Sequence, residues 1–307
     1  MSAGGGAVAE ASPSPSLNRH HRRRIVAIIA ITVTEPSPTI PTVPAKPIRR
    51  LAACVEYCGA AYSGWQYQAN APSVQARVER AVSRVADADT RVSAAGRTDA
   101  GVHGGGQVIH FDTRARRSAH EWLRGVNTHL PDDIKLLWTR EVGGDFHARF
   151  AAFERGYRYV IFNRAVAPTY LRERVAWHPM PVAVQPMRRA AAALIGRHDF
   201  SAFRGAHCQA KHPFRTLRRI DLGHAGAWIW LDFSADGFLH HMVRNIAGTL
   251  LRIGEGHEAA EWAGEILAGR DRAAAGPTAP AAGLYLTRVT YAPRHRLPPP
   301  PPACRFW

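Results

Sequence analysis

One segment of the chain gathers residues that can carry out chemistry: SAAGRTDAGVHGGG, residues 93–106. Its glycines permit tight turns and close approach of the backbone to a ligand, and the same segment contains Arg97, Asp99 and His103. A carboxylate is a competent covalent nucleophile that needs neither a metal nor a redox cofactor. The glycine spacing does not match a P-loop, because no Gly-Lys-Ser/Thr follows. The pattern alone leaves open that Asp99 only caps a turn and pairs with an arginine.

Two more residues of suitable type lie far along the chain. Tyr157 belongs to the run YRYVIF, and it would share one face of a strand with Tyr159. Arg244 lies in the run HHMVRN. A strand tyrosine commonly packs in a core and a helical arginine commonly lies on a solvated face. On residue type alone, Tyr157 and Arg244 are therefore only candidate functional residues.

The segments around these residues alternate between strand and helix patterns. Alternating or β-branched and aromatic runs predict strands at 50–57, 91–95, 107–112, 157–162, 218–222 and 228–235. Apolar residues at helical spacing predict helices at 74–86, 184–195 and 240–253, the first with Ser73 as its N-cap. Regular βαβ alternation is missing, which indicates an α+β protein with largely antiparallel sheets flanked by helices. Asp99 would then lie on a structured turn between two strands.

Length and composition predict two folded domains with an appendage at each end. The 307 residues are 46% hydrophobic, enough for two cores at roughly 100–200 residues per domain. Recurrent prolines predict a disordered, basic arm over residues 1–48, and five consecutive prolines predict an extended tail over 293–307. The rest divides into 49–150, which contains Asp99, and 151–292.

The charge of the chain favours a polyanionic partner. Lys and Arg total 40 against 24 Asp and Glu, a formal charge of +16, and basic residues bind phosphates with release of counterions. The longest apolar run, residues 25–33, is too short to span a membrane, which takes about 20 residues. Four cysteines without a paired framework favour the cytoplasm. The histidine groups at 207–212 and 240–241 lack a second pair of close ligands, so no metal is expected.

Six segments, in the expected order, resemble the family of tRNA pseudouridine synthases that modify the anticodon stem-loop. The resemblance covers residues 50–292. Its segments are SAAGRTDAGVHGGGQVIHF (93–111), FHARF (146–150), RGYRYVIFN (155–163), DFSAFRG (199–205), FLHHMVRNIAGTL (238–250) and GLYLTRVTY (283–291).

The resemblance implies a reaction and a role for each candidate residue. The family isomerises uridine to pseudouridine at tRNA positions 38, 39 and 40 without a cofactor, as a homodimer with its site in a cleft between two similar domains. Asp99 would be the nucleophile, attacking either the uracil ring or the ribose C1′, and Arg244 would keep it charged. Tyr157 would stack on the base or also assist removal of the proton from C5. Arg97 would fill the place of the flipped uridine or hold a phosphate, and His103 would stabilise the loop or contact RNA.

Two alternatives remain open from the sequence. A catalytically inactive RNA-binding module would use the same basic cleft. A hydrolase built on Asp99 and His103 would cleave a nucleic-acid substrate, whereas isomerisation conserves its mass. The chain also departs from the family pattern, because Cys58-Gly59 stands where an aspartate-glycine turn is usual.

Overall fold

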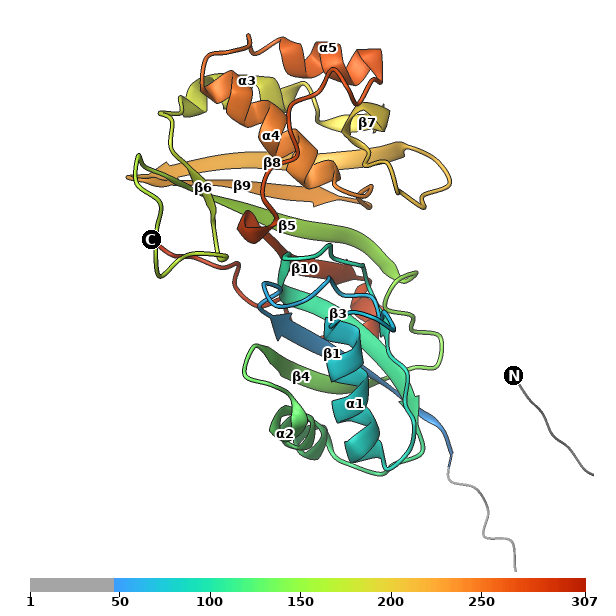
Figure 1. Cartoon of the computed structure of the whole chain (residues 1–307). Helices are drawn as coiled ribbons and strands as arrows, with labels where there is room; N and C mark the ends of the chain where they lie inside the picture. The colour runs from blue at the N-terminus through green and yellow to red at the C-terminus, as the bar shows by residue number, and fades with distance from the viewer. Residues whose placement is uncertain (1–46) are drawn as a thin grey trace, which may run out of the picture. The chain divides into compact units, whose positions relative to one another are not determined.

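The computed structural model describes residues 47–307 (Figure 1), so the predicted arm over 1–48 lies almost wholly outside the described residues. The described chain is built on a ten-stranded sheet in which β4-β1-β3-β10-β5-β9-β8-β7 are neighbours, with β2 on β3 and β6 on β5. The strands are β1 Arg49–Tyr57, β2 Ser93–Ala94, β3 His103–Thr113, β4 Ile134–Val142, β5 Ala152–Asn163, β6 Ala176–His178, β7 Gly196–Asp199, β8 Phe214–Ala225, β9 Trp228–Ala235 and β10 Leu284–Tyr291. The helices are α1 Val74–Ala86, α2 Ala119–His129, α3 Val184–Ala192, α4 Met242–Gly254 and α5 Trp262–Gly269.

The predicted mixed fold with a largely antiparallel sheet is confirmed. All strand pairs are antiparallel except β10 with β3 and β5 with β6. Helices α3, α4 and α5 lie together over the part of the sheet that contains β8 and β9, and α1 and α2 lie near β1 and β4 (Figure 1). None of the helices in this described region is both long and apolar enough to cross a membrane.

Helix α1 begins and ends where the sequence predicts. The Ser73 side chain accepts a hydrogen bond from the backbone of Ala76 and so caps the helix. Val74, Val78 and Val82 are fully buried, and they pack against the face of β1 that carries alternate apolar residues. The helix is therefore stabilised by its N-cap and by its apolar face, and both features can be recognised in the sequence.

Strand β3 begins earlier than predicted, at His103 instead of residue 107. Gly104 and Gly106, interpreted above as turn residues, are part of the strand. A Cβ on Gly104 would lie 2.4 Å from the Tyr57 ring, and one on Gly106 would lie 2.3 Å from the Thr287 carbonyl oxygen. These glycines serve close packing across the sheet, and strand pairing with β10 outweighs their turn preference.

Strand β10 joins the two halves of the sheet. It pairs in parallel with β3, placing Tyr285 opposite His103, and antiparallel with β5. The sheet is thus continuous across the predicted boundary between residues 150 and 151. Two domains, 49–150 and 151–292, remain a prediction from the sequence.

The last residues of the predicted tail, 293–307, pack on the sheet. The Trp307 ring stacks on Trp230 of β9 with ring centres 4.0 Å apart. The Arg158 guanidinium donates to the carbonyl oxygen of Cys304 at 2.8 Å. The end of the chain is consequently anchored by an aromatic and a polar contact.

The stability of the fold should depend on pH through His110 of β3. Burial first, and then the charge of His147, lowers the pKa of His110 to about 4, and its Nδ1 accepts a hydrogen bond from Ala148. A lowered folded-state pKa means that stability is complete above the unfolded pKa of about 6.5 and is lost as the pH falls toward 4. His110→Gln should remove up to about 3 kcal/mol of this pH dependence, measured as the melting temperature against pH. The exposed His224→Gln should keep the wild-type slope, and an equal flattening in both variants would contradict the assignment.

Candidate active site

Asp99 lies on the turn between β2 and β3, as predicted. Its carboxylate faces three side chains that come from the beginning of α4. The Oδ1 atom lies 3.5 Å from His240 Nε2, and the Oδ2 atom lies 3.4 Å from His241 Nε2 and 3.6 Å from Arg244 Nη1. The Asp99 side chain is 25% exposed. The carboxylate is therefore held partly accessible beside residues more than 140 positions away in the chain.

The loop that carries Asp99 is held on one side by the segment around residue 64. Trp65 donates a backbone hydrogen bond to Thr98 at 3.0 Å, and Gly101 donates one to Tyr62 at 3.3 Å. Gly64 has φ +99°, and a Cβ there would lie 2.6 Å from the Thr98 carbonyl oxygen. Only glycine combines this conformation with this approach, so Gly64 fixes where the Asp99 loop can lie.

Arg155 of β5 holds the same loop from the other side. Its partly buried guanidinium donates to the carbonyl oxygens of Ala95, Arg149, Ala152 and Asp236. Burial lowers the pKa of this guanidinium. Arg155 is not among the candidates predicted from the sequence, although it lies inside the segment RGYRYVIFN. Its partners are backbone carbonyl oxygens, which every residue carries, so no partner residue type in the sequence indicates its position.

Arg244 is a site residue and not a surface charge of the helix. Its side chain is 15% exposed. The Nε atom donates to the Ala279 carbonyl oxygen at 2.8 Å, which orients the guanidinium toward Asp99. The backbone of Ala279 donates in turn to the Arg244 carbonyl oxygen. This geometry places a fixed cation beside the carboxylate.

His240 and His241 were considered from the sequence only as metal ligands, and their position beside Asp99 was not predicted. Their rings stack with centres 3.8 Å apart. His241 has φ 61°, a left-handed conformation that is strained for a residue other than glycine. Burial lowers the pKa of His241 more than the Asp99 charge raises it. Their position just before Arg244 in the sequence could have indicated that they lie near Asp99 as well.

Tyr157 and Tyr159 have different environments although they share one face of β5. Tyr159 is fully buried and donates its hydroxyl to the Pro280 carbonyl oxygen at 2.8 Å. Tyr157 packs edge-on against Phe238 with ring centres 5.0 Å apart. Burial and, after it, the negative charge of Asp99 raise the pKa of Tyr157. Of the two tyrosines, Tyr157 is thus the one that senses the charge of Asp99, and its phenol stays protonated at neutral pH.

Arg97 is exposed beside the same loop. Its Nη1 atom donates to Gln209 Oε1 at 2.9 Å. This bond links the Asp99 loop to the segment between β7 and β8, 112 positions away. The guanidinium remains available to a ligand, because it is exposed and the bond to Gln209 uses one of its five N–H groups.

His103 lies beneath the loop at the beginning of β3. It is 2% exposed, its Nδ1 accepts from the backbone of Gly59 at 3.1 Å, and its Nε2 lies 3.2 Å from the Ala282 carbonyl oxygen. The ring stacks on Tyr285 with centres 4.5 Å apart. Burial lowers the pKa of His103, as suits a neutral ring that accepts at Nδ1 and donates from Nε2. Of the two roles expected for it, loop stabilisation fits this geometry.

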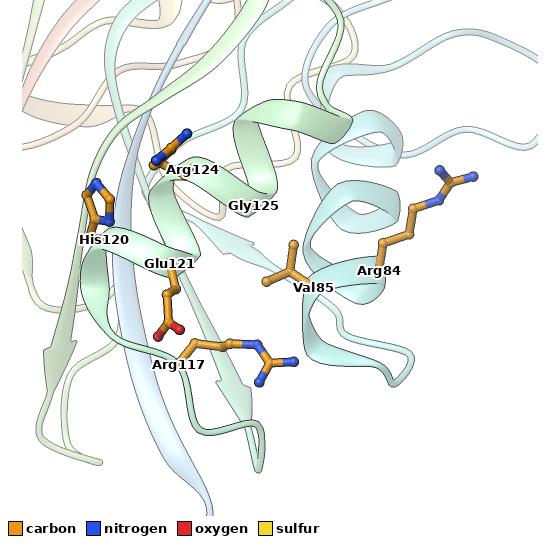
Figure 2. Close-up of a pocket in the computed structure, with 7 residues that line it drawn as sticks. All are labelled: Arg84, Val85, Arg117, His120, Glu121, Arg124 and Gly125. Carbon is orange, nitrogen blue, oxygen red and sulfur yellow. The ribbon is translucent and has the colours of Figure 1, made fainter.

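A separate basic pocket of about 410 Å³ lies between α1 and α2. Figure 2 shows Arg84 extending from α1 while Arg117 and Arg124 come from the start and the body of the α2 region. Glu121, which also lines the pocket, is engaged in capping α2 through the backbone of Ser118. The pocket has the charge of a surface that binds phosphates.

Comparison with known proteins defines the class of the chain. The family model for tRNA pseudouridine synthase matches residues 53–151 and 190–292. The chain belongs to the tRNA pseudouridine synthase family.

Individual relatives narrow the comparison further. The chain is 54% identical over 249 residues to tRNA pseudouridine synthase A of Thiobacillus denitrificans, which covers 81% of this chain and 96% of the relative. It is 49% identical over 252 residues to tRNA pseudouridine synthase A of Pseudomonas aeruginosa, covering 82% of this chain and 88% of the relative. The two segments matched by the family model contain Asp99 and Arg244.

Proposed function

We propose that this chain isomerises uridine to pseudouridine in tRNA with Asp99 as its nucleophile. The observation that carries the proposal is the Asp99 carboxylate facing Arg244 on a loop fixed from both sides. Membership in the tRNA pseudouridine synthase family supports the reaction. The geometry supports the assignment of the carboxylate.

The reaction needs one covalent bond to the enzyme and no change in substrate mass. A carboxylate oxygen of Asp99 forms a bond to the uracil ring or to the ribose C1′. The N1–C1′ bond breaks, the base turns, and a C5–C1′ bond forms. On the ribose route, attack by C5 on C1′ displaces the Asp99 oxygen; on the ring route, the Asp99 oxygen leaves the ring as the C5 proton is lost. The proton on C5 passes to solvent and N1 takes one up, so the carboxylate is regenerated. Arg244 holds its positive charge 3.6 Å from the attacking carboxylate. Both routes use the same neighbours of Asp99.

Tyr157 is assigned to hold the base. Its raised pKa leaves the phenol protonated at neutral pH, so it suits stacking better than removal of the C5 proton. An aromatic ring tolerates rotation of the base, and base stacking is worth about 1–3 kcal/mol. Arg97 is exposed on the loop. It is assigned to fill the place that the flipped uridine leaves in the stem, or to hold its phosphate.

We also propose the anticodon stem-loop, at positions 38, 39 and 40, as the substrate of a cytoplasmic homodimer. The catalytic groups come from both predicted domains, Asp99 from 49–150 and Tyr157 with Arg244 from 151–292. This supports a cleft between the domains. The formal charge of +16 and the basic pocket at Arg117 support binding of a nucleic acid.

The two alternatives receive less support. A hydrolase would need His103 as the base for Asp99, but both ring nitrogens of His103 contact backbone groups. An inactive module would have no need of a fixed guanidinium beside a partly buried carboxylate. The site favours covalent catalysis over both.

Position-resolved mapping of pseudouridine tests the proposed function. Transfer RNA from cells lacking this protein should lose pseudouridine at positions 38–40 and regain it when the purified protein is added. An unchanged map would overturn the proposed substrate. Conversion of the tRNA to cleaved fragments would instead favour a hydrolase.

Tyr157→Ala should lower kcat/KM by about 10- to 100-fold, the equivalent of about 1–3 kcal/mol of stacking. Tyr157→Phe keeps the ring and should stay within about tenfold of the wild type. Steady-state rates on one tRNA measure both. Equal losses in the two variants would show that the hydroxyl, and not the ring, is what matters.

A further inference from the structure

The group of side chains around Asp99 has the composition of a metal site. Asp99, His240 and His241 each offer one ligand atom, and these atoms all lie within 4.8 Å of one another. No other group of three such residues in the described region meets this condition. The juxtaposition arises from the fold, because the aspartate and the histidine pair come from different halves of the chain.

The spacing of the ligand atoms suits an ion of the size of zinc. Zinc bonds of about 2.0–2.1 Å in a tetrahedral arrangement separate neighbouring ligand atoms by about 3.3 Å. His240 Nε2 lies 3.5 Å from Asp99 Oδ1 and His241 Nε2 lies 3.4 Å from Asp99 Oδ2, and both distances are close to this value. The two stacked rings present their Nε2 atoms to the same carboxylate. Turning one carboxylate oxygen toward both nitrogen atoms would bring the three side chains around one ion.

We propose that Asp99, His240 and His241 bind one divalent transition-metal ion, with zinc as the best fit, and that the bound ion inhibits the enzyme by occupying the nucleophile. The inhibitory part rests on the proposed function, whereas the binding part rests on the geometry alone. Two imidazoles with one carboxylate match zinc, whereas magnesium and calcium prefer oxygen ligands. A three-residue site also leaves one position open to water.

Arg244 opposes binding of a cation, since its guanidinium lies 3.6 Å from Asp99 Oδ2. The two histidines, which also face the Asp99 carboxylate, are the proposed ligands. Removing a histidine and removing Arg244 should therefore change metal affinity in opposite directions, which a nonspecific surface site would not give.

Zinc titration of the purified full-length enzyme against a chromogenic chelator tests the proposal directly. The wild type should bind one tight zinc ion per chain and lose pseudouridine formation in parallel, with full recovery on adding EDTA. His240→Asn and His241→Asn should each weaken zinc binding by about 10- to 100-fold, at least the effect of disturbing an outer-shell partner. Arg244→Met should tighten binding, because it removes a like charge.

Control variants separate this site from other histidines and thiols. His224→Asn changes an exposed histidine of β8, and Cys208→Ser changes a residue next to His240 in space. Both variants should keep wild-type zinc affinity. Unchanged affinity in both histidine variants would overturn the proposal, as would loss of the tight ion in Cys208→Ser. Chelator competition does not depend on activity, so failure of the zinc site and failure of Asp99 as nucleophile remain distinguishable.

Discussion

Asp99→Asn is expected to abolish pseudouridine formation while the protein still binds tRNA. An amide has nearly the shape of the carboxylate but is not a competent nucleophile. The backbone bonds that fix the loop, from Trp65 to Thr98 and from Gly101 to Tyr62, do not involve the side chain. Loss of a covalent catalyst should cost at least about 10³-fold in the single-turnover rate. Rapid-quench assays with chemical labelling of pseudouridine measure that rate, and filter binding measures affinity.

Asp132→Asn is a matched control for this substitution. Asp132 is also a surface aspartate of the first half of the sequence, and its carboxylate is fully exposed beside Lys135. It should retain the wild-type rate. Residual isomerisation by Asp99→Asn near the level of the control would remove Asp99 from the nucleophile's role, whatever the tRNA affinity.

Gly64→Ala is expected to cause the second largest loss, although Gly64 touches no substrate in the proposed reaction. The residue has φ +99°, and a methyl group would lie 2.6 Å from the Thr98 carbonyl oxygen. The Asp99 loop must move to relieve this contact. Misplacement of a catalytic group by about 1 Å can cost about 10²-fold, so kcat/KM should fall by about that factor. Hydrogen exchange should show faster opening of residues 95–102, with the rest of the sheet as protected as in the wild type.

Gly144→Ala provides the comparison. No atom lies within 4 Å of a Cβ at Gly144, and its φ is not positive. This variant should match the wild type in rate and in exchange. Equal activity of the Gly64 and Gly144 variants would show that the loop adapts without consequence for catalysis.

Local signals in the sequence were sufficient for those elements whose cause is local. Helix α1 has both its cap and its apolar face within 14 consecutive residues, and both agree with the structure. Helix α2 has similar signals in the Ser118–Glu121 capping box and in buried Trp122. These signals are local too, although α2 is not among the helices predicted from the sequence.

The parts that could not be predicted depend on contacts between distant segments. The residues near position 104 do not indicate that the Tyr57 ring and the backbone of β10 will pack closely against the glycines of β3. Nothing near Arg155 indicates that four carbonyl oxygens will surround it. His240 and His241 acquire their meaning only when α4 places them at Asp99. The resemblance to the family identified the segments, but the local pattern did not contain their mutual geometry.

The position of β10 between β3 and β5 bears on how the enzyme matures during synthesis. Asp99 follows β2 and precedes β3, whereas Tyr157 belongs to β5, and the strand that joins these two parts is the last one translated. A nascent chain that has not yet reached Leu284 carries Asp99, Tyr157 and Arg244 and lacks the strand that joins the two parts of the sheet. The enzyme should therefore become active only after its final strand has left the ribosome, so incomplete chains would not modify the tRNAs that decode them.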